Sequence, residues 1–270
     1  LFKNRIYTPT LLAAFLIAIG MFGTILYLPL FVQAVLGRTA TNSGAVLTPM
    51  MLAFVFSSVV GGQILSRTGR YKALAIGTVA VATVGMYLLS RMDVTTTNAT
   101  VVRNMIVLGL GIGTTMSLFT IVIQNAFPPE RLGEVTSALT FFRSIGGTVG
   151  AAILGTVMTN RFQSELTARI PDQVRALIPA DRLATLENPQ VFMSPEAMQR
   201  MHEQAAAFGP QGQQVLEMLL GAIRTALATA LDHVFLAGTF IMALALLCTL
   251  LIPEVPLRRS NTRPPAALGH

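Results

Sequence analysis

A single charged side chain, Arg143, lies within residues 135–160 of the sequence. If this stretch is a spanning helix, Arg143 lies about ten positions, or about 15 Å, into it. Insertion of an arginine near the bilayer centre costs about 2.5–3.5 kcal/mol, so its side chain should face a polar interior or a partner. Two interpretations remain open: Arg143 engages anionic groups or a carboxylate in a cavity, or it bonds backbone carbonyls in a structural role.

The residues around Arg143 place further polar and small side chains on the same helical face. A similar stripe occurs in the preceding apolar segment. Its glycines at 109–113 do not form a nucleotide-binding loop, because they lie inside an apolar helix and follow no strand. Small residues in such a position favour close helix packing. The two stripes consist of Thr136, Thr140, Arg143, Gly147 and Ala151, and of Gly109, Gly113, Ser117, Thr120 and Gln124.

Any cavity should be lined by the first, second, fourth and fifth apolar segments. The third and the last, 73–89 and 234–252, are almost wholly aliphatic and suit lipid-facing positions. Methionine, aromatic and small polar side chains suit a permissive apolar site. The candidate cavity residues are Tyr27, Gln33, Met50, Phe54, Ser117, Thr120, Gln124, Thr140 and Arg143.

The sequence contains none of the motifs of an intramembrane protease or an ATP-driven pump. We therefore expect no enzyme activity, no catalytic residues, no cofactor and no metal site. Cys248 is the single cysteine, so an internal disulfide is excluded. Asp232 and His233 open the last apolar segment; a proton relay is one interpretation, and a favourable acidic residue near a helix N-terminus is the other.

The composition indicates a membrane protein. Hydrophobic residues make up 53% of the 270 positions and charged residues 11%, with a mean hydropathy of +0.63. Soluble domains carry about 25% charged residues. The net charge of +7 comes from cations scattered singly between apolar runs, so we expect no nucleic acid partner.

Charged residues divide the chain into six apolar runs. Each is long enough to cross a bilayer, which takes roughly 20 residues. Continuous apolar runs favour helices over the alternating strands of a barrel. We therefore expect an all-α membrane protein with kinks near Pro29 and Pro49. The predicted spans are 9–35, 43–65, 72–91, 102–127, 133–159 and 230–252.

The remaining segments complete the organisation. We predict that 1–160 holds the first five spanning helices and that 161–215 is an external helical loop. The last spanning helix with its lead-in follows at 216–255, and 256–270 is a disordered cytoplasmic tail. Nine Lys and Arg residues lie on the side of both termini against three on the opposite short loops, which places both termini in the cytoplasm. The chain lacks an initiator Met, and we expect it to be a fragment.

A short basic turn, 61–72, joins the second and third predicted helices. Gly69 permits a tight turn here. This turn resembles the cytoplasmic signature of the major facilitator superfamily, Gly-x-x-x-Asp-Arg-x-Gly-Arg-Arg/Lys. Ser66 stands where that signature has Asp, so any carboxylate partner of the arginines would come from elsewhere, such as Glu130 or Glu134. The matching residues are Gly62, Arg67, Gly69 and Arg70.

Two further stretches are similar to fourteen-helix multidrug:proton antiporters of that superfamily. One is 27–33 with Gly37, Gly44 and Pro49, and the other is 142–150. The resemblance covers about 5–255 and matches the C-terminal half only. It implies six helices as a 3+3 inverted repeat, one half of a major facilitator fold, with the proton-carrying carboxylates largely in the other half.

We therefore expect the C-terminal half of an inner-membrane secondary transporter that exports drugs or amphipathic compounds by proton exchange. Its partners would be the lipid bilayer, an N-terminal transporter half, small amphipathic substrates and protons. Two alternatives remain. One is a specific metabolite or anion porter in which Arg143 binds substrate, and the other is a non-transporting membrane scaffold whose external hairpin recruits a partner.

Overall fold

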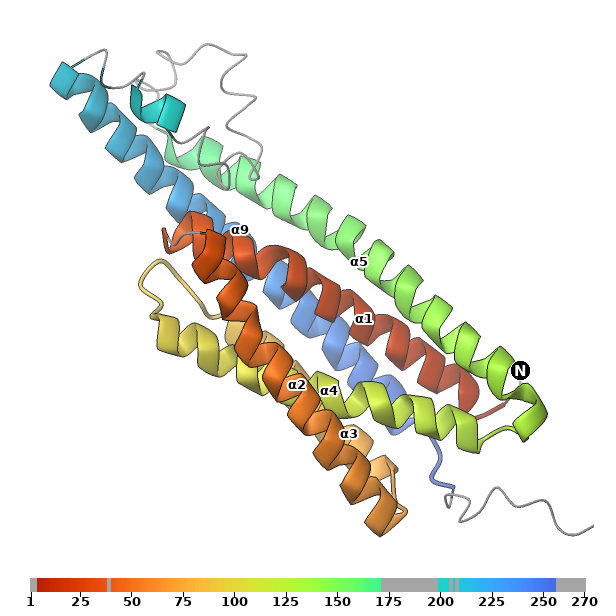
Figure 1. The fold of residues 1–270 in the computed structure, drawn as a ribbon. Coiled ribbons are helices and arrows are strands. Elements are labelled where there is room, and N and C mark those ends of the chain that lie inside the picture. The colour runs from red at the N-terminus through yellow and green to blue at the C-terminus, as the bar shows by residue number, and fades with distance from the viewer. Residues whose placement is uncertain (1–3, 38–39, 171–198, 204–205, 207–208, 256–270) are drawn as a thin grey trace, which may run out of the picture.

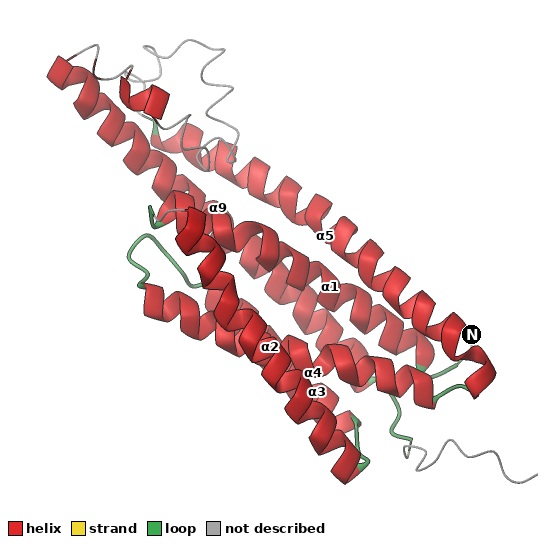
Figure 2. Ribbon diagram, in the orientation of Figure 1, coloured by secondary structure: helices red, strands yellow, loops and turns green. Residues whose placement is uncertain are grey.

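The computed structural model describes residues 4–37, 40–170, 199–203, 206 and 209–255, and its elements are helices (Figures 1 and 2). Six of them are long and apolar enough to cross a membrane. The all-α, six-span prediction is confirmed. A π-helical turn, Phe31–Val35, extends the first helix, and a 3-10 turn, Pro129–Arg131, precedes the fifth. The helices are α1 (Tyr7–Leu30), α2 (Ala40–Thr68), α3 (Lys72–Leu89), α4 (Asn98–Asn125), α5 (Leu132–Arg169) and α9 (Gly209–Leu250).

Helix packing follows a repeat of three. The leading helix of the first three, α1, packs mainly against α5 and α9, whereas α4, which leads the second three, packs against α2 and α3. The third helices of the two sets, α3 and α9, also meet. Each set thus inserts its leading helix into the other, as two equivalent units related by a pseudo-two-fold axis would. This architecture is consistent with one half of a major facilitator fold built from a 3+3 repeat.

The connections alternate between the two ends of the bundle. The N-terminus, the α2–α3 turn, the α4–α5 turn and the end of α9 lie at one end (Figure 1). The connections from α1 to α2 and from α3 to α4 lie at the opposite end, as six successive membrane crossings require.

The fifth and last helices are longer than their predicted spans. With 38 and 42 residues, α5 and α9 are about 57 and 63 Å long, against a hydrocarbon thickness of about 30 Å. Beyond the other helices they continue side by side (Figure 1). Phe162, Leu166 and Ile223 are buried in this extension, so apolar contact continues the pairing past the membrane boundary. Residues 161–169 and 209–215 are helical, while 171–198 and 256–270, parts of the predicted loop and tail, lie outside the described residues.

Pro29 changes the first helix in the way its chemistry suggests. Proline has no N–H to donate and its ring crowds the preceding turn. The helix widens directly after it into the π-helical turn, where the Leu36 N–H donates to the Phe31 carbonyl at 3.1 Å. Gly37, at φ +66°, then ends the helix in a conformation that glycine favours. At Pro49, in contrast, α2 continues as an α-helix.

The glycines of α4 allow two helices to approach from opposite sides. A Cβ atom on Gly113 would lie 2.1 Å from the Phe54 carbonyl oxygen of α2. A Cβ on Gly111 would lie 2.3 Å from the backbone nitrogen of Ala82 on α3. Neither distance is possible for a real side chain, so the packing interpretation of these glycines is confirmed. Gly109 and Gly113 allow α2 to approach α4, and Gly111 between them allows α3 to approach from the other side.

Candidate functional site

Arg143 reaches from α5 to the backbone of α4. Its Nη2 donates to the Met116 carbonyl at 2.7 Å, and both terminal nitrogens lie 3.5 Å from Thr120 Oγ1. Thr120 itself donates to the same carbonyl at 3.1 Å. The Nε–H of Arg143 is buried and has no hydrogen-bond partner among the described residues. The guanidinium is therefore anchored at one end and keeps one buried donor for a further acceptor.

A line of polar side chains continues along α4 on both sides of this bond. Ser117 shares a hydrogen bond with Ser58 of α2 at 2.5 Å. Gln124 donates to Thr136 of α5 at 3.3 Å. The structure thus brings four of the predicted cavity residues together as one polar line between α2, α4 and α5: Ser117, Thr120, Gln124 and Arg143.

The other predicted cavity residues lie apart from this line. Tyr27 is half-buried, and its hydroxyl lies 3.1 Å from the Cβ position of Gly155, twelve residues or about 18 Å along α5 from Arg143. Gln33 is half-buried in the π-helical turn. Thr140 is exposed and donates to the carbonyl of its own helix one turn back at 3.0 Å.

Met50 and Phe54 of α2 lie against α4 through their backbone carbonyl groups. Both carbonyls face glycines of α4: Cβ atoms at Gly109 and Gly113 would lie 2.5 and 2.1 Å from them. Met50 is buried at 4% exposure, while Phe54 is half-buried. These positions therefore set the spacing between α2 and α4.

The sequence did not predict the hydrogen bonds that serine and threonine hydroxyls form where α2 and α4 approach closely. Thr114 donates to the Ser57 carbonyl at 2.6 Å. Ser57 in turn donates to the Phe54 carbonyl at 3.2 Å and lies 3.4 Å from the Gly109 carbonyl. The signal was the Ser57-Ser58 pair, two adjacent hydroxyls in an otherwise apolar run.

The basic turn has the conformation expected of its glycine. Gly69 has φ +65°, and its N–H donates to the Leu65 carbonyl at 2.9 Å, which ends α2. Ser66, which replaces the signature's Asp, donates to the Gln63 carbonyl at 2.9 Å. A Cβ on Gly62 would meet no atom within 4 Å, so helix packing does not require glycine there.

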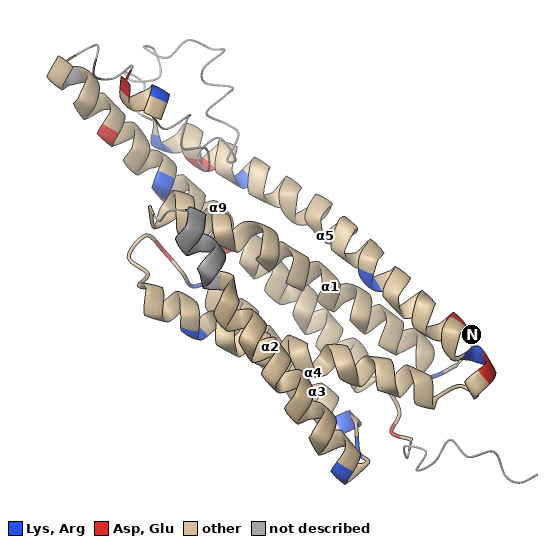
Figure 3. Ribbon diagram, in the orientation of Figure 1, with Lys and Arg blue, Asp and Glu red and all other residues tan. Residues whose placement is uncertain are grey.

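The expected pairing of Arg67 and Arg70 with Glu130 or Glu134 is wrong. Glu165–Arg169 is the ion pair that the described residues form. Figure 3 shows the reason: the basic α2–α3 end and the charged turn before α5 lie at separate corners of the same end of the bundle.

Tyr71 is a second residue that sequence reasoning missed. Its hydroxyl donates to the Pro253 carbonyl and accepts the Val255 N–H at 3.0 Å. The side chain is 1% exposed, and burial raises the pKa of its phenol. Tyr71 therefore fastens the segment that follows α9 to the α2–α3 turn.

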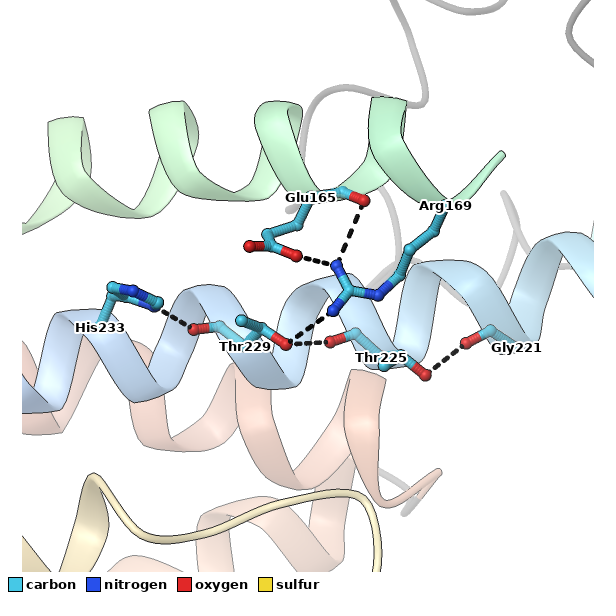
Figure 4. A network of polar contacts seen from close by, with 6 residues as sticks. All are labelled: Glu165, Arg169, Gly221, Thr225, Thr229 and His233. Atoms are coloured by element: carbon cyan, nitrogen blue, oxygen red, sulfur yellow. Dashed lines mark hydrogen bonds and ion pairs between the residues drawn. The ribbon is translucent and has the colours of Figure 1, made fainter. Parts of the chain in front are cut away.

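A polar contact joins the end of α5 to the middle of α9 (Figure 4). Arg169 pairs with Glu165 one turn back and lies 3.4 Å from Thr229 Oγ1 of α9. His233 Nδ1 bonds to the Thr229 carbonyl at 2.8 Å, a contact within its own helix. The described residues contain no group of three His, Cys, Asp or Glu side chains that could hold a metal ion.

Comparison with known proteins assigns the family. Residues 1–151 match the family described as the Major Facilitator Superfamily. The chain belongs to the Major Facilitator Superfamily. Relatives in this superfamily are named as transporters, and the six apolar helices of this chain make it a multi-pass membrane protein.

Two bacterial members of the superfamily show how the chain aligns with longer proteins. It is 33% identical to the multidrug transporter protein MdtP of Bacillus subtilis over 274 aligned positions. This alignment covers 97% of the chain and 48% of MdtP. It is 36% identical over 166 positions to multidrug resistance protein 3 of the same species, covering 62% of the chain and 32% of that protein. The chain thus spans about half the length of MdtP.

A solved structure of a bacterial protein has the same fold over half of its length. A crystal structure of a bacterial homologue of the human lysosomal transporter Spinster, inward-facing and occupied, superposes with a TM-score of 0.56 at 16% identity. The match covers 90% of this chain and 50% of that one. In fold, this chain therefore corresponds to half the length of that protein.

Proposed function

We propose that this chain is the C-terminal half of an inner-membrane secondary transporter that exports amphipathic compounds in exchange for protons. The observation that carries the proposal is the alignment of 97% of the chain with a protein named as a multidrug transporter. The C-terminal placement rests on the motifs at 27–33 and 142–150. Alternating access would rock these six helices against an N-terminal half.

The exposed faces of α2 and α5 support this pairing. These are the least buried of the spanning helices. A six-helix unit alone would leave their apolar side chains in lipid, whereas a second unit would cover them and enclose a cavity in front of the polar line. The exposed apolar residues include Leu52, Val55, Phe56 and Val59 on α2 and Phe141, Ile145 and Ile153 on α5.

The charge distribution supports a proton site in the other half. No Asp or Glu precedes Asp93 in the sequence, and α4 contains none. Arg143 is then the charged residue of the polar line that borders the proposed cavity. In the proposed orientation both termini are cytoplasmic, and the extended ends of α5 and α9 lie outside the cell.

Transport by right-side-out membrane vesicles loaded with dye tests the proposal. The full-length protein should expel a cationic amphipathic dye when a proton gradient is present, and expulsion should stop when an uncoupler collapses the gradient. Arg143→Gln should lower the transport rate without loss of membrane insertion, whereas Arg103→Gln, at an exposed position near the start of α4, should leave it unchanged. Unchanged dye retention across several amphipathic substrates would count against multidrug export.

A specific anion porter is the second candidate, and one observation favours it. Arg143 has no carboxylate partner among the described residues, and its buried Nε–H has no acceptor there. An anionic substrate would supply both a negative charge beside the guanidinium and an acceptor for the Nε–H. Competition separates the candidates: dye expulsion inhibited by small carboxylates or phosphates only in the presence of Arg143 indicates an anion site.

A further inference from the structure

A groove of about 500 Å³ lies between the start of α1 and the end of α9, at the end of the bundle where α1 begins and α9 ends. This volume falls in the range of about 300–1,000 Å³ typical of small-molecule sites. The groove lies away from the polar line around Arg143, and the transport proposal does not use it. The residues that define its character are Arg5, Leu12, Cys248, Leu251 and Pro253.

The walls of the groove are apolar and continue into a lipid-facing surface. Leu12 is 48% exposed and Leu251 is 73% exposed, while Cys248 is buried at the groove. Leu251, directly after α9, also continues an exposed apolar stripe of that helix with helical spacing. The stripe consists of Phe240, Leu244, Leu247 and Leu251, each at least half exposed. Hydrocarbon that covers this stripe can therefore extend into the groove.

Arg5 gives the groove a positive charge where the helices leave the membrane. Its side chain is exposed and forms no ion pair within the described part of the chain. The N-terminus of α1, which begins two residues later, adds its positive dipole on the same side. Glu254 follows Pro253 but does not line the groove. An apolar slot with an arginine at its mouth is complementary to a phosphate attached to an acyl chain.

We propose that this groove binds an anionic phospholipid, with its phosphate on Arg5 and one acyl chain along Leu12, Cys248 and Leu251. Basic pockets between transmembrane helices on the cytoplasmic side bind anionic lipid headgroups in this way. Only the assignment to the inner leaflet rests on the proposed orientation; binding itself depends on neither transport nor topology.

The groove stays open when a second transporter half is present. The exposed faces proposed for that contact belong to α2 and α5, whereas the groove belongs to α1 and α9. In Figure 1, α9 runs behind α1 and α2 lies in front, so α1 separates α9 from α2. A lipid at this site would therefore contact the complete transporter from the bilayer.

Cys248 provides the readout. The protein is purified in detergent with added phosphatidylglycerol or phosphatidylcholine of identical acyl chains, and maleimide modification of Cys248 is measured by peptide mass spectrometry. Phosphatidylglycerol should slow modification more than phosphatidylcholine does. Loss of one basic contact at a membrane surface weakens binding about fivefold, so Arg5→Gln should remove most of that difference. Arg131→Gln, an exposed arginine at the same end of the bundle but outside the groove, should retain it.

Three further experiments separate lipid binding at Arg5 from binding of a free anion and from nonspecific protection of Cys248. Inorganic phosphate alone should not protect Cys248, because it lacks the acyl chain; protection by phosphate would assign the site to a free anion and overturn the lipid proposal. Leu12→Trp fills the groove and should lower the number of phosphatidylglycerol molecules retained in native mass spectrometry. Equal protection by both lipids, or an equal effect of Arg5→Gln and Arg131→Gln, would also overturn the proposal, since neither is compatible with a phosphate bound to Arg5.

Discussion

The contact between Gly113 and α2 gives a sharp test of the helix packing. In Gly113→Ala the new Cβ would lie 2.1 Å from the Phe54 carbonyl oxygen and 2.3 Å from Ser57 Oγ. Carbon and carbonyl oxygen atoms approach to about 3.3 Å. The obstacle is backbone, so α2 and α4 must separate by about 1.2 Å to accept one methyl group.

That separation also breaks the hydrogen bonds between the two helices. The bonds from Thr114 to the Ser57 carbonyl and between Ser58 and Ser117 are 2.6 and 2.5 Å long. A separation of about 1.2 Å would lengthen both beyond hydrogen-bonding distance. Each interhelical bond in a membrane contributes about 0.6 kcal/mol, and overpacking costs about 1–3 kcal/mol. We expect Gly113→Ala to lower the free energy of unfolding by about 2–4 kcal/mol.

The matched control is Gly77→Ala. Gly77 lies inside α3, and a Cβ there would meet no atom within 4 Å. Replacement of such a glycine removes backbone freedom from the unfolded chain and should stabilise the protein by about 0.5–1 kcal/mol. Detergent-titrated unfolding followed by circular dichroism compares the two variants, since the chain has no tryptophan to serve as a fluorescent probe. If the two variants have equal stability, α2 and α4 do not approach as closely as the structure shows.

Two further predictions concern the turns at opposite ends of the bundle. Tyr71→Phe removes the hydroxyl that bonds the backbone after α9, and should lower stability by about 1–2 kcal/mol. It should also speed proteolysis near Val255, whereas Tyr87→Phe, at an exposed position on α3, should change neither measurement. In the α3–α4 connection, hydrogen bonds from the Thr95 hydroxyl and N–H hold the pKa of Asp93 below its ordinary value. A lowered pKa in the folded state stabilises the protein above the unfolded-state value of about 3.9. The small stability advantage over Asp93→Asn should therefore be present at neutral pH and disappear as the pH falls through the folded-state pKa; an equal difference at all pH values would contradict this.

Most of the fold was predictable because a membrane imposes simple constraints on sequence. Uninterrupted apolar runs located all six spanning helices, and Pro128-Pro129 marked the turn between α4 and α5. Gly69 was predictable because a positive φ at a helix end requires a residue without a side chain. The lengths of α5 and α9 were not, because the apolar residues that join them beyond the bilayer lie among charged residues and proline-rich sequence.

The site was predictable only where polarity contrasts with an apolar background. Ser117, Thr120, Gln124 and Arg143 stood out for this reason, and the structure joins them. Side-chain types alone could not show that Met50 would be buried, since a methionine suits a cavity wall and a helix interface equally. The bonds of Tyr71 to residues more than 180 positions away could not be found from sequence, because no local pattern encodes such a pairing.

The two equivalent interfaces of the repeat differ in chemistry, and the difference bears on function. Where α5 packs on α1, Gly146 and Gly150 approach the backbone of Phe15 and Ile19, and the contact is apolar. Where α4 packs on α2, glycines allow the same close approach, but serine and threonine hydroxyls bond across it. Hydroxyls can rotate to new acceptors when helices slide, whereas interlocked apolar side chains must separate first. Of these two interfaces, α2–α4, which adjoins Arg143, is therefore the one where helices can slide along each other with less resistance.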